Sequence, residues 1–170
     1  MRGFNVTSRP PWFSGSLKMT EREFYEELAG TDPDSAAGLP DFFDRCRGLG
    51  LVVAAGDAAM VIQWLDADAG KVVFAAILKD GRVDTRYVCA AAREIGDRPA
   101  GEAYLDGVAS LLGGGAVLKK GGDLTWHVTR DGELPPIRDL LAVSGRWLAL
   151  IATTMDRLRE AARGGGGGGG

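Results

Sequence analysis

Three turn signals at short intervals divide the middle of the chain into segments of strand length. They are Gly56-Asp57, residues 66–70 and Asp80-Gly81. Gly and Asp favour tight turns, because Gly adopts positive φ and the Asp side chain bonds the nearby backbone. Connections this short join antiparallel strands, since a parallel pair needs a crossover of a dozen or more residues. The sequence therefore predicts an antiparallel meander of three to four strands.

The segments between these turns have the composition of strands. Residues 51–55 and 58–65 form the first two, and residues 71–78 are almost continuously apolar. Such a run predicts a central strand that is buried on both faces. Apolar and polar residues then alternate from Val83 to Cys89, as in a half-exposed fourth strand. A separate hairpin is predicted from residues 116–120 and 124–129.

Helices are expected before and after the meander in the chain, and they are expected to pack on one face of the sheet. Thr20 and Glu23 form a capping box, which predicts a helix that ends at Gly30. Residues 31–38 are expected to be a loop, and a second helix is expected from about Pro40 to Arg47. Another helix is predicted over residues 102–112, whereas residues 90–100 have no clear pattern.

The last predicted helix is the longest and runs from Ile137 to about Arg163. Its apolar side chains repeat at helical spacing and form one face, while charged residues such as Arg146 and Asp156 lie largely opposite. We expect the end of this face to pack on the first helix or on a second subunit. The apolar face consists of Ile137, Leu140, Leu141, Ser144, Trp147, Leu148, Ile151, Met155 and Leu158.

Together these elements predict an α+β fold, with an antiparallel sheet of three to four strands plus a hairpin packed against helices. From about Pro40 to Arg163 the element order resembles that of type III secretion chaperones and YbjN-like proteins. This resemblance implies a non-enzymatic and often dimeric protein. The order helix, three strands, helix and strand is also similar to the core of restriction-endonuclease-like nucleases, which implies a possible nuclease or a degenerate relative.

We expect a single domain over residues 19–163. Residues 1–18 are read as an N-terminal arm or a vector-derived remnant, and residues 164–170 as a non-functional glycine tail. The arm contains Pro10-Pro11-Trp12-Phe13, an apolar segment that cannot bury itself locally. Trp12 and Phe13 are therefore candidate interface residues, together with Ile151, Met155 and Leu158 of the last helix.

The composition of the chain limits which classes of partner it can bind and in which cellular compartment it is expected. The net charge is −3 and the pI is about 5.2, which disfavours a nucleic-acid coat because such proteins carry a basic excess. No segment is long and apolar enough for a membrane span, and no signal peptide is recognised. Cys46 and Cys89 both fit apolar patterns, so free thiols in a reducing cytoplasm are expected.

The sequence contains few of the residue patterns that known catalytic sites need. A nuclease of the restriction-endonuclease type needs clustered carboxylates and a lysine two residues after an acid, yet no lysine of this chain follows that pattern. His127 is the only histidine and alternates outward on its strand, and zinc has no ligand pattern. No cofactor is expected. Lys119 and Lys120 form a small basic tip, a candidate anion contact.

The sequence thus favours a non-catalytic protein-interaction or regulatory domain that binds a protein partner or itself. Two alternatives stay open at this point. One is a restriction-endonuclease-like domain, in degenerate form, and the other is a small-molecule binder with a pocket between sheet and helices.

Overall fold

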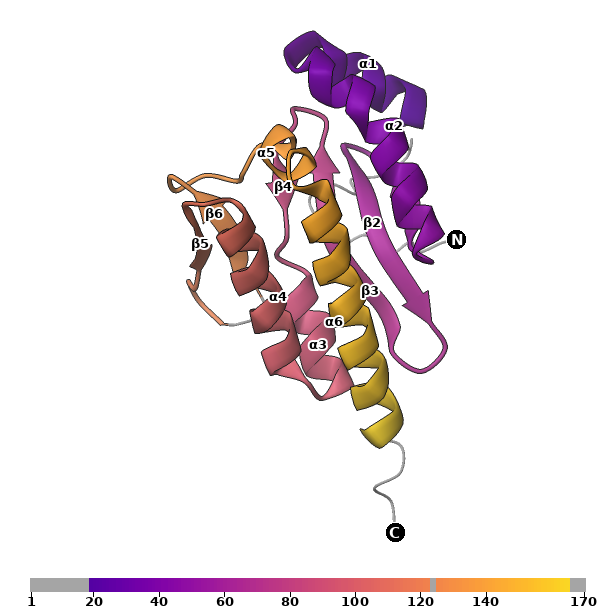
Figure 1. Cartoon of the computed structure of the whole chain (residues 1–170), viewed down its shortest axis with the longest axis vertical. Coiled ribbons are helices and arrows are strands. Elements are labelled where there is room, and N and C mark those ends of the chain that lie inside the picture. Colours follow the sequence, from indigo (N-terminus) through magenta and orange to yellow (C-terminus); the bar gives the residue numbers. More distant parts are fainter. Residues whose placement is uncertain (1–18, 123–124, 166–170) are drawn as a thin grey trace, which may run out of the picture.

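The computed structural model describes residues 19–122 and 125–165, and the fold is α+β (Figure 1). A four-stranded antiparallel sheet and a two-stranded hairpin are packed with six described helices. The elements in chain order are α1 (Glu21–Thr31), α2 (Pro33–Gly48), β1 (Val52–Ala55), β2 (Ala59–Asp66), β3 (Gly70–Leu78), β4 (Val83–Asp84), α3 (Val88–Ile95), α4 (Arg98–Leu111), β5 (Gly115–Leu118), β6 (His127–Arg130), α5 (Ile137–Leu141) and α6 (Ser144–Gly165).

The predicted meander is confirmed, with the strands in the order β1-β2-β3-β4 and every pair antiparallel. The apolar strand β3 lies inside the sheet between β2 and β4, as its composition predicts, and Phe74 and Ile77 are fully buried. The register of β2 and β3 shifts once, since Ile62 pairs with Ala75 but Gln63 pairs with Val73. Phe74 is therefore the additional residue of a β-bulge.

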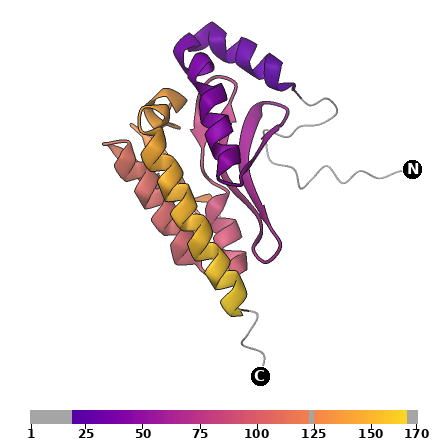
Figure 2. The same ribbon diagram turned by 45° about the vertical axis from the view of Figure 1, so that its right-hand side comes forward.

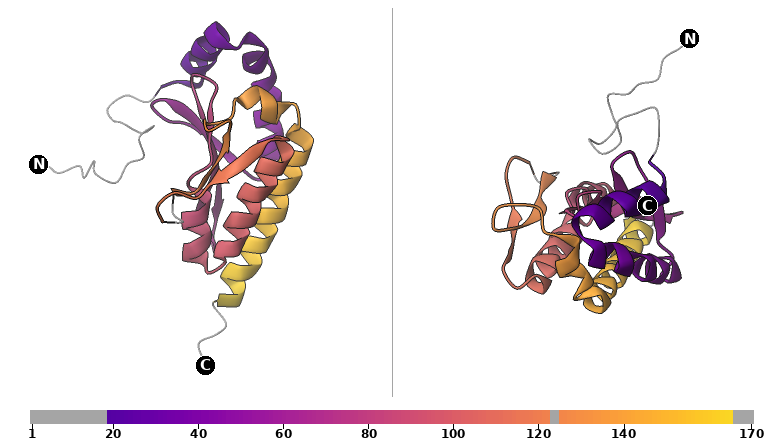
Figure 3. Two further views of the ribbon diagram at one scale, coloured as in Figure 1. Left: turned by 90° about the vertical axis from the view of Figure 1, so that its left-hand side faces the viewer. Right: turned by 90° about the horizontal axis from the view of Figure 1, so that it is seen from above.

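Helices α3, α4 and α6 lie together on one side of the four-stranded sheet (Figure 2). Helices α4 and α6 run side by side, and the β5–β6 hairpin packs on α4 (Figure 3). The core between these layers is aromatic as well as aliphatic. Trp147 of α6 stacks on Phe42 of α2, with ring centroids 5.0 Å apart and planes inclined by 12°. This stack joins the N-terminal helices to the C-terminal helix.

The first helix is confirmed, but the predicted loop over residues 31–38 is wrong. The capping box forms, because the Glu23 N–H donates to Thr20 Oγ1 and the Thr20 N–H donates to Glu23 Oε2. Only Asp32 separates α1 from α2, and its carboxylate caps the second helix by accepting from the Ser35 N–H at 3.2 Å. Helix α2 thus begins at Pro33, and Pro40 lies inside it rather than in its first turn.

The predicted fourth strand is correct only at its start. Strand β4 ends at Asp84, because the Asp84 carboxylate accepts from the Arg86 N–H at 3.1 Å and turns the chain out of the strand. Residues Val88 and Cys89 then belong to α3, where they face the core. The helix predicted from residue 102 also begins earlier, at Arg98, with Asp97 as its cap.

The long C-terminal helix is divided into α5 and α6. The backbone tightens between them, where the Val143 N–H bonds the Leu140 carbonyl three residues earlier. The predicted apolar face is confirmed, since its members from Ile137 to Leu158 are buried except Leu141 and Ser144, which are half-buried. Helix α6 packs on α4 and α3, and not mainly on α1 as one expectation had it.

Candidate functional site

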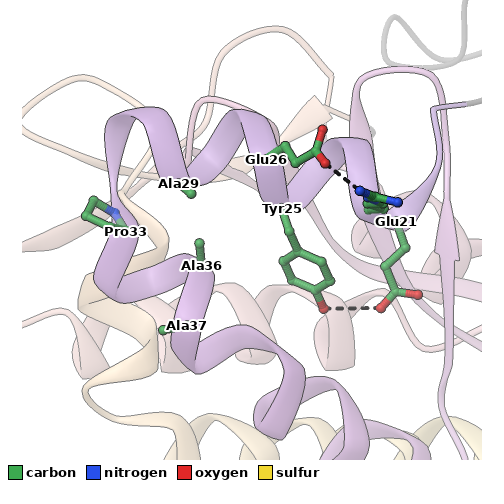
Figure 4. A pocket seen from close by; sticks show the side chains of 8 residues that line it. Glu21, Tyr25, Glu26, Ala29, Pro33, Ala36 and Ala37 are labelled. Atoms are coloured by element: carbon green, nitrogen blue, oxygen red, sulfur yellow. Dashed lines mark hydrogen bonds and ion pairs between the residues drawn. The ribbon is translucent and has the colours of Figure 1, made fainter.

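A groove with a mostly apolar lining lies between α1 and α2 (Figure 4). Its volume is about 640 Å³. The single residue between the two helices forces the chain to reverse sharply, so that α1 and the first turns of α2 lie beside each other. The lining residues are Glu21, Arg22, Tyr25, Glu26, Ala29, Pro33, Ala36 and Ala37.

The floor of this α1–α2 groove consists of small and ring side chains. Ala29 projects from α1, and Ala36 and Ala37 project from α2 (Figure 4). Three alanines leave space where larger side chains would join the two helices. Tyr25 closes one end, with its ring 6.3 Å from that of Phe43, so the groove is anchored to the core there. An arrangement of this kind accepts an apolar side chain from outside.

The rim of the groove is acidic. Glu21 accepts a hydrogen bond from the Tyr25 hydroxyl at 3.1 Å, and Glu26 is paired with Arg22 at 3.1 Å. Burial, followed by the charge of Glu21, holds the pKa of Tyr25 well above its ordinary value. The Tyr25 hydroxyl therefore stays protonated at neutral pH, where it is a hydrogen-bond donor and has no character as a general base.

A second hollow of about 580 Å³ lies at the C-terminal end of α4 and includes Asp106, Ser110 and residues 113–115. One of the three glycines here, Gly115, has a packing reason. A Cβ on Gly115 would lie 2.7 Å from the Ala109 carbonyl oxygen, so a side chain there would collide with the end of the helix. The triplet follows a helix, whereas a phosphate-binding loop precedes one.

The candidate anion contact at Lys119 and Lys120 lies in the β5–β6 connection. Lys119 is committed to other groups, since its Nζ is 2.8 Å from Glu102 Oε1 and 4.8 Å from the centre of the Trp126 ring. The hydrogen bond that Lys119 donates to the Glu102 carboxylate raises the pKa of Lys119. Its charge is thus largely offset by an adjacent carboxylate, and both Lys119 and Lys120 are exposed.

The candidate interface residues fall into two groups. Trp12 and Phe13 lie outside the described residues. Ile151, Met155 and Leu158 are buried within one chain, in contact with the core that α3 and α4 complete. In this structure these three side chains are core residues and present no surface to a partner.

The other titratable side chains that the sequence indicated as candidates do not gather at one site. His127 is half-buried on β6, and its Nδ1 lies 3.0 Å from the Thr125 carbonyl oxygen. Cys46 and Cys89 are buried free thiols, and burial raises the pKa of Cys46 to about 12. Over residues 19–122 and 125–165, no three His, Cys, Asp or Glu side chains lie close enough together to hold a metal ion.

Sequence reasoning missed the groove because it assigned residues 31–38 to a loop. The signal was present, since Asp32-Pro33 is the pairing of an N-cap residue with proline in the first helical turn. Reading it would have placed Ala36 and Ala37 on a helix beside α1. Without the tertiary contact between the helices, however, neither alanine has any pattern that indicates a binding surface.

None of the described helices is both long and apolar enough to cross a lipid bilayer. No family model, curated protein or solved structure matches the chain. The groove and its charges are therefore the basis on which a function is proposed.

Proposed function

We propose that this chain is a non-catalytic interaction domain whose α1–α2 groove binds a basic, apolar segment of a partner protein. The observation that carries the proposal is an apolar floor of three alanines set within an acidic surface. A partner with large apolar side chains would fill the floor, and its Lys or Arg residues would meet the rim.

The charge of this region supports a basic partner. Residues 20–34 contain six acidic residues and one basic residue, Arg22. Lys79 and Arg47 approach the same helix, at 3.3 Å from Glu27 and 3.7 Å from Glu21, and they leave the surface acidic overall. Exposed pairs of this kind contribute little to stability, but a net field of one sign steers an oppositely charged partner.

The shape of the groove supports a peptide segment more than a small ligand. It runs along two helices, and its lining combines small alanine side chains with the Tyr25 ring (Figure 4). Binding of an amphipathic segment in a groove between helices uses a few apolar anchors spaced along the segment. The nuclease alternative has no corresponding observation in its favour, since the described carboxylates do not gather at a metal site.

The proposal is tested by selecting ligands from a library of random twelve-residue peptides against the full chain. We expect enrichment of peptides that combine Leu, Phe or Trp with Lys or Arg. Titration of the selected peptides should show an affinity that weakens as salt is raised, because part of the attraction is between exposed charges. Enrichment of acidic peptides would contradict the proposal.

A matched pair of variants locates the binding. Ala37→Arg fills the groove and adds a positive charge to it, whereas Ala149→Arg places the same side chain on an exposed position of α6. Both alanines are exposed helical residues, so both variants should keep the fold. We expect Ala37→Arg to lower the affinity for the selected peptides at least tenfold and Ala149→Arg to leave that affinity unchanged. Equal affinities for the two variants would remove the groove as the site.

A further inference from the structure

The hydrogen bonds of strand β6 show which way its backbone groups point. The Val128 N–H donates to Thr85 Oγ1 at 3.0 Å. The Arg130 N–H donates to the Glu133 carbonyl at 2.8 Å. Both N–H groups therefore point away from β5. In an antiparallel ladder, pairs of residues that exchange hydrogen bonds alternate with pairs that do not. The pairs that contain Val128 and Arg130 are thus of the second kind.

Strand β5 therefore has an edge whose backbone groups are unpaired. Val117 faces Val128 and Gly115 faces Arg130. The N–H and carbonyl groups of Gly115 and Val117 consequently also point away from the neighbouring strand. Over residues 19–122 and 125–165, no group hydrogen-bonds to them. The hairpin projects from the body of the fold (Figure 3), and an open edge of this kind is a template for pairing with another strand.

We propose that two copies of this chain associate through this β5 edge, with the two strands antiparallel and Ala116 at a two-fold axis. In this register Gly115 of each copy faces Val117 of the other copy. Each such pair exchanges two backbone hydrogen bonds, so every outward group of these residues gains a partner. The strands β6-β5-β5-β6 form one continuous antiparallel sheet. The assembly is closed, because each copy presents the same edge to the other.

The side chains beside this edge suit the same register. A Cβ at Gly115 would point at Ala109 of α4. Ala116 and Leu118 alternate with Gly115, so they lie on the opposite face of the strand, where both are exposed. In the dimer Leu118 lies opposite Gly114 of the second copy, whose absent side chain leaves room for the leucine. The pairing thus covers an exposed apolar side chain as well as backbone groups.

The charges at the ends of the edge are complementary. The register brings Lys120 of one copy to Leu112 of the other, at the C-terminal end of α4. This helix has no basic residue in its last turn, so no side chain of that turn offsets the negative end of the helix dipole. Asp106 lines the hollow at the same end and, like Lys120, has no ion-pair partner among the described residues. Lys120 therefore supplies the positive charge that this end of α4 lacks.

The shortness of the strand makes the association weak. Only the four residues Gly115–Leu118 form β5, so the interface is smaller than that of a permanent dimer, and we expect dissociation on dilution. None of the residues named for the dimer lines the α1–α2 groove. The dimer and the binding of a basic peptide can therefore succeed or fail separately.

Disulfide trapping tests the register. Across a pair without backbone bonds the two Cα atoms lie about 4.5 Å apart, within disulfide range, so the full chain with Ala116→Cys should oxidise to a linked dimer. Leu118→Cys is the matched control, because it is exposed on the same face but its two copies are roughly 13 Å apart along the strands. The natural thiols of Cys46 and Cys89 are buried. Equal linking of the two variants, or none in Ala116→Cys, would overturn the proposal.

Charge reversal tests the contact between Lys120 and the end of α4. In sedimentation equilibrium the wild type should change from monomer to dimer as its concentration rises. Lys120→Glu and Asp106→Lys should each weaken the dimer at least fivefold, and their combination should restore it. Lys71→Glu changes the net charge equally at an exposed position of β3 and should have no effect. A monomer at every concentration, or a combined variant weaker than both single variants, would contradict the proposal.

Discussion

The indole Nε1 of Trp147 donates a hydrogen bond of 3.0 Å to the hydroxyl of Tyr104, and both side chains are fully buried. The Tyr104 hydroxyl donates in turn to the carbonyl of Phe74 at 3.2 Å. That carbonyl belongs to the bulge residue of β3. One hydroxyl thus links α6, α4 and the sheet, and it satisfies two polar groups that are out of reach of water.

Removal of the Tyr104 hydroxyl should lower the free energy of unfolding by a large amount for the loss of one atom. Tyr104→Phe leaves the Trp147 N–H and the Phe74 carbonyl without this partner, and we expect a loss of about 1–3 kcal/mol in the free energy of unfolding. Tyr25→Phe is the control, because it removes a hydroxyl bonded to Glu21 at the surface, and its cost should be below about 0.5 kcal/mol. Urea denaturation measures both, and equal costs would contradict the importance of the buried link.

Two neighbouring glycines should differ sharply in their tolerance of a side chain. A Cβ at Gly115 would approach the Ala109 carbonyl oxygen at 2.7 Å and its Cα at 2.8 Å, whereas a Cβ at Gly114 has nothing within 4 Å. We expect Gly115→Ala to destabilise the fold by about 1–3 kcal/mol, as other overpacked sites do. Gly114→Ala should be neutral or slightly stabilising. Thermal unfolding of the two variants tests this, and a reversed order would show that the contact is wrong.

The buried thiol of Cys46 makes stability depend on alkaline pH. Burial raises its pKa to about 12, whereas an unfolded cysteine titrates near 8.5. The folded state therefore holds the proton more tightly, so this contribution is complete below pH 8.5 and is lost as pH rises toward the folded pKa. At pH 10 the loss amounts to about 2 kcal/mol, from a difference of about 1.5 pH units at 1.36 kcal/mol each.

A variant without the thiol should separate this effect from other titrations. We expect the stability advantage of the wild type over Cys46→Ala to shrink by that amount between pH 7 and pH 10. Leu39→Ala removes a buried side chain from the same helix without a titratable group, so its difference from wild type should not change. Urea midpoints at several pH values provide the comparison, and a constant Cys46→Ala difference would contradict the prediction.

Asp97 has two roles that substitution can separate. Its carboxylate caps α4 by accepting from the Ala100 N–H at 3.3 Å, and it holds Arg157 of α6 through bonds of 2.8 and 2.9 Å. Asp97→Ala removes both interactions and should cost about 1–2 kcal/mol, most of it from the cap. Asp97→Asn retains a capping oxygen and should cost less than about 1 kcal/mol, since the ion pair is partly exposed. Chemical denaturation in low and high salt tests this, because added salt screens the ion pair in the wild type. In high salt the Asn variant should come close to the wild type and the Ala variant should retain the cost of the lost cap, so an Ala variant that matches the wild type there would contradict the capping role.

Local patterns predicted those parts of the fold that depend on residues close in sequence. The capping box at Thr20 and Glu23 requires only a separation of three residues, and it forms as expected. The short turns at Gly56-Asp57 and Asp80-Gly81 likewise specify antiparallel neighbours. The apolar face from Ile137 to Leu158 follows from helical spacing alone, so it is also confirmed even though the helix is divided.

The errors occur where a local pattern fits two structures. The alternation from Val83 to Cys89 suits a strand, but the Asp84 carboxylate bonds the Arg86 N–H, and Val88 and Cys89 reach the core from a helix instead. Residues 31–38 have loop composition, yet a cap at Asp32 and burial of Ser35 and Leu39 make them helical. In both places a local side-chain hydrogen bond, together with burial against other elements, decides between the alternatives.

By itself, the sequence determined the antiparallel meander, the central position of residues 71–78 and the apolar face of the last helix, because these depend on spacing and on turn chemistry along the chain. Only the tertiary structure decided that α6 covers α3 and α4, which turned Ile151, Met155 and Leu158 from interface candidates into core residues. It also decided that Ala29, Ala36 and Ala37 line one groove. The physical reason is that burial and concavity belong to pairs of elements, and a pattern within one element does not specify which partner covers it.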